Sequence, residues 1–150
     1  MLKRPAKRQQ SPWLIHFFQR ARVEDSAQTV PAREYLERCP ASVRAKLLAV
    51  VKAVADAPPP MFSGGGKWEA MHDEMAGFYE IRADGPQRRH YRLFCVLERD
   101  GAQLGLDGPS LVLITGMDKG FRTTFTKADY EAVRKLGEEY RSRNPRSVVE

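Results

Sequence analysis

Charged side chains alternate with apolar ones in two consecutive segments of this 150-residue chain, in a spacing suited to acid–base chemistry on an anion. Glu80 and Arg82 are two residues apart, so an extended strand places both on one face. His90 and Arg92 have the same spacing in the next segment. A hairpin symmetric about Pro86 would pair residue 82 with residue 90 and residue 80 with residue 92. These four side chains would then lie on a single surface, whereas a slip of one residue would separate them.

A third segment can bring more positive charge to this surface. The apolar run Leu111–Thr115 is followed by the sequence GMDKGFR, which contains Lys119 and Arg122. Two guanidinium groups and an ammonium group that converge on a rigid sheet suit the phosphate of a phosphodiester. The alternative is a solvated sheet face that carries a Glu80–Arg92 ion pair, worth about 0.2–1 kcal/mol.

Such an anion site could cleave RNA without a metal ion. The 2′-hydroxyl attacks the adjacent 3′-phosphate, and the protein positions it, stabilises charge on the phosphorane and assists proton transfer. Arg82 and Arg92 would stabilise the charge. Lys119 would do the same or donate a proton. Either His90 or Glu80 would act as the general base.

Other residues are candidates for RNA contact or for packing. Lys67 ends the sequence SGGGK, which is not a phosphate-binding Walker A motif because Trp68 follows the lysine. Trp68 and Phe121 could stack an unpaired base, or pack in the core as aromatic rings commonly do. Tyr140 either belongs to the apolar stripe of the last helix or presents its phenol at the catalytic face. Arg122, Lys67 and Trp68 form the predicted RNA-binding set.

No metal site or cofactor is predicted. The three histidines lack the spacing of metal ligands, and Cys39 and Cys95 form no C-x-x-C pair. Two cysteines are too few for a disulfide scaffold, so we expect both to be buried thiols in a reducing compartment. No apolar stretch approaches the roughly 18 residues of a membrane span, and the basic N-terminus is followed by no sustained apolar segment. The sequence therefore predicts a cytoplasmic protein without membrane contact.

The charge balance favours a polyanionic partner. Twenty-five Lys and Arg residues oppose nineteen Asp and Glu residues, which gives a formal net charge of +6. The excess belongs to the N-terminal third, where residues 1–11 form a basic tail. A positive protein favours nucleic acid through release of counterions, or the charge serves solubility alone.

The pattern of apolar residues predicts the elements that must position these side chains. The expected order is strand, helix, helix, strand, strand, strand, helix. This is a small α+β domain in which a mainly antiparallel sheet packs against an N-terminal helical hairpin and a C-terminal helix. The predicted strands are 13–18, 78–83, 90–98 and 111–115, and the segment 61–75 is predicted to be a loop.

Local signals mark where the helices begin. Pro31 suits the first position of one helix, and Ser42 can cap the next, which Pro58–Pro60 ends. Thr126 and Asp129 are spaced like a capping box for the last helix. The expected buried stripes of the second and last helices are Val43, Leu47, Val50, Val51 and Val54, and Val133, Gly137 and Tyr140.

Three stretches of the chain resemble the RelE/ParE toxin superfamily, in particular its HigB-like, phage-derived branch. These stretches are Gly77–Arg82 (GFYEIR), Tyr91–Phe94 (YRLF) and Leu111–Lys119 (LVLITGMDK). The segment 33–56 is similar to the helical hairpin of that family. The likeness covers residues 12–142 as a single domain. The segments 1–11 and 143–150 remain as tails.

The resemblance implies a toxin of a type II toxin–antitoxin system that cleaves messenger RNA at the ribosome. A cognate antitoxin, expected to be a helix-turn-helix protein, would neutralise it. By position, Arg82 matches the family's E-x-R arginine, Arg92 its Y-R arginine, and Lys119 the first of two lysines. Gly120 replaces the second lysine, and Arg122 could restore the lost charge. Two alternatives share the fold: a ParE-like inhibitor of DNA gyrase that cleaves no RNA, and an inactive phage-derived binding module.

Overall fold

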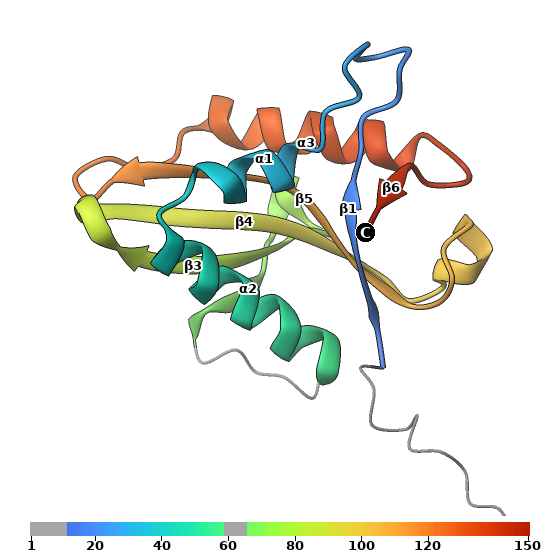
Figure 1. Ribbon diagram of the computed structural model, residues 1–150. Helices are drawn as coiled ribbons and strands as arrows, with labels where there is room; N and C mark the ends of the chain where they lie inside the picture. The colour runs from blue at the N-terminus through green and yellow to red at the C-terminus, as the bar shows by residue number, and fades with distance from the viewer. Residues whose placement is uncertain (1–11, 59–65) are drawn as a thin grey trace, which may run out of the picture.

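The computed structural model describes residues 12–58 and 66–150, and it arranges them as one sheet with helices on both faces (Figure 1). The main elements are β1 (Leu14–Phe18), α1 (Pro31–Arg38), α2 (Ala41–Asp56), β2 (Trp68–Ala70), β3 (Tyr79–Gly85), β4 (Arg89–Glu98), β5 (Ser110–Gly120), α3 (Lys127–Arg141) and β6 (Val148–Val149). Short 3-10 turns occur at Asp73–Met75, Pro86–Arg88 and Gly101–Leu104. The predicted tail 1–11 lies outside the described residues, as do Ser63, Gly64 and Gly65.

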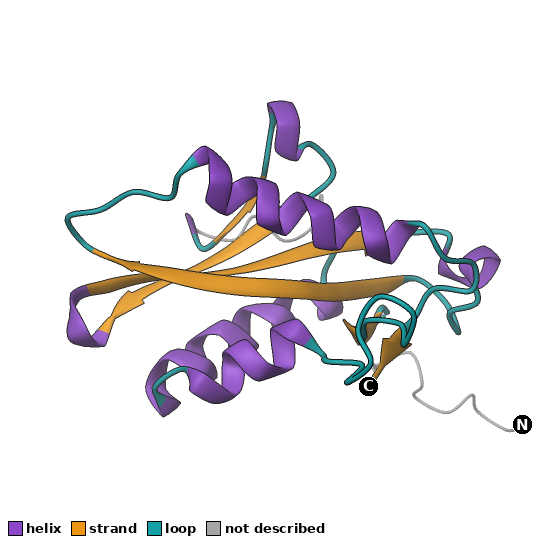
Figure 2. Cartoon of the chain, turned by 90° about the horizontal axis from the view of Figure 1, so that it is seen from above, coloured by secondary structure: helices purple, strands orange, loops and turns teal. Residues whose placement is uncertain are grey.

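The strands follow the order β2-β3-β4-β5-β1-β6 across the sheet. β1 runs parallel to β5, and every other neighbouring pair is antiparallel. Helices α1 and α2 cover one face and α3 covers the other, so the sheet lies between two helical layers (Figure 2). The predicted α+β class with a mainly antiparallel sheet is confirmed.

Two cores follow from the alternation of side chains along the strands. The first joins buried side chains of α1 and α2 to Ile81, Leu93 and Leu113 of the sheet. The second joins Tyr140 and other α3 residues to Phe94 on the opposite face. Neighbouring β4 residues thus belong to different cores, because successive side chains of a strand point to opposite faces.

The helix signals were correct for α1 and α3. Pro31 occupies the first turn of α1. In α3 the Thr126 side chain accepts a hydrogen bond from the Asp129 N–H, and the Asp129 carboxylate accepts one from the Thr126 N–H, which completes the capping box. The prediction that Ser42 caps α2 was wrong. That helix already begins at Ala41, after Pro40, and no side chain caps it.

Two strands were missed because neither has a strand pattern of its own. β2 lies within the predicted loop 61–75, and its three residues are extended because they pair with Tyr79–Ile81 of β3. β6 lies within the predicted tail 143–150 and pairs with the end of β1. Both are far shorter than the five or six residues typical of strands. Pairing with a longer neighbour therefore decides their conformation.

The hairpin of β3 and β4 places the predicted side chains on one face, but with different partners. Arg82 lies opposite Arg92 rather than His90, and Glu80 lies opposite Phe94. The turn at Pro86–Arg88 is centred one residue later than Pro86, and Gln87 and Arg88 are both left-handed there, with φ values of 66° and 55°. Each partner thereby moves by two residues. Because the side-chain period is two, the face is preserved.

Candidate functional site

Strands β3, β4 and β5 bring the predicted catalytic residues together on the face that α3 covers. His90 of β4 lies between Asp84 of β3 and Lys119 of β5 in the pairing register. We call the following set the sheet-face cluster. It consists of Glu80, Arg82, Asp84, His90, Arg92 and Lys119. The sequence analysis named all of these residues except Asp84.

Glu80 is the buried centre of the cluster. Its side chain is 8% exposed, and its Oε2 accepts a hydrogen bond of 2.9 Å from Arg82 Nε. Its Oε1 lies 3.9 Å from Arg92 Nε and has no hydrogen-bond partner among the described residues. The carboxylate thus lies between two guanidinium groups that face each other across the strands. Arg82 and Arg92 would otherwise repel one another at directly opposed positions.

His90 and Asp84 form a second pair. The imidazole Nδ1 lies 2.8 Å from the Asp84 Oδ1, and Arg92 Nη1 lies 3.5 Å from the same oxygen. The hydrogen bond with His90, together with the nearby charge of Arg92, lowers the pKa of Asp84 below its usual range. A carboxylate in this position orients the imidazole through Nδ1.

Lys119 is held by the N-terminus of α3. Its ammonium group lies 3.1 Å from the Asp129 carboxylate, which is also the second half of the capping box. The backbone N–H of Thr126 and the lysine side chain lower the pKa of Asp129. The local signal that starts α3 therefore also fixes a cation of the cluster.

Each permanent cation of the cluster has a carboxylate partner. Arg82 binds Glu69 of β2 at 2.7 Å in addition to Glu80, so four carboxylates surround three cations and His90. The sequence analysis considered the cations and Glu80 alone. The structure adds three carboxylates beside these cations, and it contains the Glu80–Arg92 ion pair of the alternative interpretation, at 3.9 Å. Glu69 and Asp84 are the exposed ones, at 50% and 60%.

The predicted RNA-binding residues do not form one surface. Arg122 is exposed in the turn after β5, and Lys67 is exposed beside β3. Trp68 is 5% exposed and stacks on Tyr79 with ring centroids 4.7 Å apart, so it packs in the core of the α2 side. Trp68 therefore has the packing role, one of the two alternatives given in the sequence analysis. Neither face of its ring is accessible to a base.

Two further aromatic residues have clear positions. Phe121 is 39% exposed and its ring lies 4.8 Å from that of His90. The Arg88 guanidinium lies 5.7 Å from the same ring. Tyr140 is fully buried and donates a hydrogen bond of 2.8 Å to Glu98, which confirms its place in the apolar stripe. Burial also raises its pKa above the usual range.

Sequence reasoning named Glu80 but missed the other three carboxylates beside these cations. Asp84 continues the alternation of Glu80 and Arg82, which is a signal that could have found it. Glu69 and Asp129 come from segments that contact the cluster only in the folded chain. Within residues 12–58 and 66–150, no group of three or more His, Cys, Asp and Glu side chains is arranged to hold a metal ion.

No protein-family model, curated protein or solved structure matches this chain. Among the described residues, no helix has the length and apolar character needed to cross a membrane.

Proposed function

We propose that this protein is a metal-independent endoribonuclease, a RelE/ParE-like toxin of a type II toxin–antitoxin system acting in the cytoplasm. One observation carries the proposal: a histidine oriented by a carboxylate lies on the same sheet face as two arginines and a lysine. The two helical layers on opposite faces of the sheet are compatible with the RelE-like arrangement. Messenger RNA at the ribosome would be the substrate. A helix-turn-helix antitoxin would be the partner.

His90 is the general base in this mechanism. With Nδ1 bound to Asp84, its Nε2 can accept the proton of the attacking 2′-hydroxyl. Its side chain is 30% exposed, whereas that of Glu80 is 8% exposed and engaged with Arg82. Glu80 therefore acts as a positioning residue. Of the two bases that the sequence left open, we therefore propose His90.

Arg92 stabilises the phosphorane. Lys119 does the same, or donates a proton to the 5′-oxygen that leaves as its bond to phosphorus breaks. Lys119 is directly opposite His90 in the register, and Arg92 is two residues further along the same face. The Arg92 side chain is also held over the Phe125 ring, 5.7 Å from its centroid. A phosphate that replaces the exposed Glu69 contact would meet Arg82, with Arg92 on the same face, while Asp84 stays bound to His90. Prearranged donors of this kind stabilise charge that develops in the transition state.

Cleavage of translated message tests the proposal. Purified protein is added to a translating extract, and the message is mapped for new ends. We expect cleavage by the wild type, and losses of at least about 100-fold for His90→Gln and Lys119→Ala, as expected for an acid–base or charge-stabilising group. Lys135→Gln on the exposed surface of α3 is the control and retains activity. An intact message in the presence of folded wild-type protein would refute the ribonuclease.

The neutralised cluster favours a second candidate, a binding module that cleaves no RNA. Four carboxylates around three cations suit protein contact as well as phosphate contact. A supercoiling assay separates the ParE-like form of this candidate from the ribonuclease. Inhibition of gyrase without RNA cleavage would favour it, and harmless expression without an antitoxin would favour an inactive module.

A further inference from the structure

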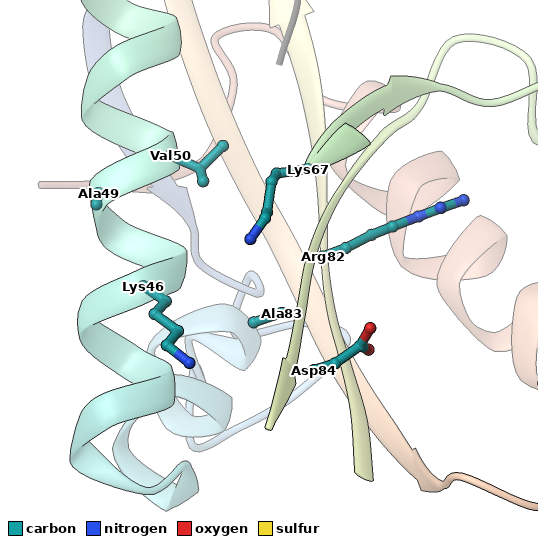
Figure 3. Close-up of a pocket in the computed structure, with 7 residues that line it drawn as sticks. All are labelled: Lys46, Ala49, Val50, Lys67, Arg82, Ala83 and Asp84. Carbon is teal, nitrogen blue, oxygen red and sulfur yellow. The ribbon is translucent and has the colours of Figure 1, made fainter. Parts of the chain in front are cut away.

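A second set of cations lies on the other side of β3, away from the sheet-face cluster. There, a pocket of about 360 Å³ opens between α2 and β3, and we call it the α2–β3 pocket (Figure 3). Its lining residues are Lys46, Ala49, Val50, Lys67, Arg82, Ala83 and Asp84.

Two lysines face each other across this pocket. Figure 3 shows the Lys46 and Lys67 side chains pointing into the space between α2 and β3, while Arg82 points away to the other side of the strand. Lys46 reaches the end of β3, because a Cβ added to Gly85 would lie 3.9 Å from its Nζ. Within the described part of the chain, neither lysine forms an ion pair. In contrast to the cluster, this pocket therefore holds positive charge that a ligand can use.

The edge of β3 adds a backbone donor. β2 pairs with β3 as far as Ile81, and the N–H of Arg82 then bonds to the carbonyl of Lys67. Alternate residues of a strand direct their N–H groups to the same side, so that of Asp84 points to the same edge. No strand among the described residues covers this edge beyond Arg82. Two ammonium groups beside an edge N–H suit an anion with several acceptor oxygens.

The α2–β3 pocket shares two of its lining residues, Arg82 and Asp84, with the cluster. A smaller pocket of about 200 Å³ shares Lys67, Arg82, Ala83 and Asp84 with it and is also lined by Arg92. A chain of phosphates could thus pass from the cluster over the edge of β3 into the space between α2 and β3. The walls formed by Val50 and Ala83 are apolar and would cover the sugar.

We propose that the α2–β3 pocket binds a backbone phosphate of single-stranded RNA next to the nucleotide held at the sheet-face cluster. The inference rests on the proposed function for its ligand, RNA. Unlike the proposed function, it does not require RNA cleavage, because the pocket contributes only to binding. Lys46 and Lys67 are phosphate contacts without a chemical role.

The salt dependence of binding tests this site. The probe is a fluorescent 2′-O-methyl RNA decamer, which has no free 2′-hydroxyl to attack its own phosphates. Its affinity is measured by anisotropy as the KCl concentration rises. Each phosphate contact to a single strand contributes about 0.7 to the slope of log K against log salt. We expect Lys46→Gln/Lys67→Gln to reduce the slope by about 0.7, the contribution of one phosphate, and to weaken binding several-fold at low salt.

Matched variants distinguish a specific effect of the pocket lysines from a general effect of net charge. Lys46→Arg/Lys67→Arg keeps both cations and should keep the slope. Arg22→Gln/Lys135→Gln removes two exposed cations elsewhere and should leave the slope unchanged. Lys46 and Lys67 are exposed, so their variants should fold, and circular dichroism verifies this. A wild-type slope in the folded Lys46→Gln/Lys67→Gln variant overturns the inference.

The two proposals can fail separately. If the wild type leaves messenger RNA intact but Lys46→Gln/Lys67→Gln lowers the salt slope, the pocket stands and the ribonuclease fails. If the wild type cleaves RNA and the slope is unchanged by the substitutions, the ribonuclease stands and the pocket fails. Equal loss of slope in the Arg22→Gln/Lys135→Gln control would also overturn the pocket, because net charge would explain the effect.

Discussion

His90 and Asp84 lie at paired positions of β4 and β3, with the imidazole Nδ1 2.8 Å from the carboxylate Oδ1. The pair is built by the register of the hairpin, which is set by the turn at Pro86–Arg88. It orients the ring that faces Lys119 on β5. The same contact makes the titration of Asp84 a direct measure of whether the imidazole is in place.

Replacing His90 with Gln should raise the pKa of Asp84 toward its ordinary value of about 3.9. The hydrogen bond with His90 is the largest cause of the lowered pKa in the wild type. Carboxyl carbon chemical shifts followed by NMR from pH 2 to pH 6 measure the change. Arg92 lowers the pKa by a smaller amount, so part of the shift should persist in the variant.

The sign of the effect on stability follows from the same shift. A lowered pKa in the folded state means that Asp84 stabilises the fold above about pH 3.9, and that this contribution is lost as the pH falls through the lowered value. The variant should therefore show a shallower loss of stability in this acid range. An Asp84 titration that is the same in both proteins would contradict the hydrogen bond.

Glu80→Gln should tighten RNA binding and slow cleavage. The substitution removes a negative charge between Arg82 and Arg92, which favours phosphate, but it loosens both guanidinium groups. We expect the free energy of unfolding to fall by about 1–2 kcal/mol, less than for a fully buried pair because Arg82 is 37% exposed. Anisotropy with uncleavable RNA and urea unfolding measure the two effects.

Glu69→Gln is the matched control for that experiment. Glu69 binds the same arginine but is 50% exposed, so its removal should change stability by less than about 0.5 kcal/mol. If both substitutions cost the same, Glu80 is not the buried centre of the cluster.

Thr126→Ala should destabilise the protein by about 1 kcal/mol, because it removes one half of the capping box that starts α3. Thr124→Ala is the control, since Thr124 is exposed and its hydroxyl has no hydrogen bond within the described residues. Urea unfolding should distinguish the two. Equal midpoints would show that the cap contributes little to this helix.

Gly137→Ala should destabilise the protein. Helix propensity alone would have the opposite effect, because it favours alanine over glycine by about 1 kcal/mol. A Cβ at this position would lie 2.2 Å from Cζ of Phe78, a fully buried ring. Overpacking of a core costs about 1–3 kcal/mol, and at this distance we expect it to exceed the gain. Gly120→Ala meets nothing within 4 Å and should be nearly neutral. A raised urea midpoint for Gly137→Ala would contradict the close packing of α3 on the sheet.

Features that depend on local backbone geometry could be predicted from the chain. The capping box of Thr126 and Asp129 involves residues three apart, and the stripe to Tyr140 follows the helical period. The common face of Glu80 and Arg82 follows from the period of two in any strand. None of these three features depends on which strand or helix packs beside the segment.

Features that depend on the neighbouring segment could not be predicted. β2 is extended because β3 pairs with it, and this pairing buries Trp68 on the α2 side. The partner of Arg82 across the hairpin depended on a turn in which Gln87 and Arg88 are both left-handed, which their residue types did not indicate. The sequence also did not indicate that the cations separate into two groups. One group is paired with carboxylates in the sheet-face cluster, and the other consists of the pocket lysines, which form no ion pair among the described residues.

The amino-acid sequence by itself determined the helices, most of the longer strands and the face on which β3 and β4 carry their charges, because backbone periodicity and capping act over a few residues. The second half of β5, which carries Lys119, was not predicted, since the strand was expected to end at Thr115. The tertiary structure alone decided how those charges are balanced. Coulomb energy depends on distances between atoms, and Glu69, Asp84 and Asp129 come near their cations only when the sheet and α3 assemble.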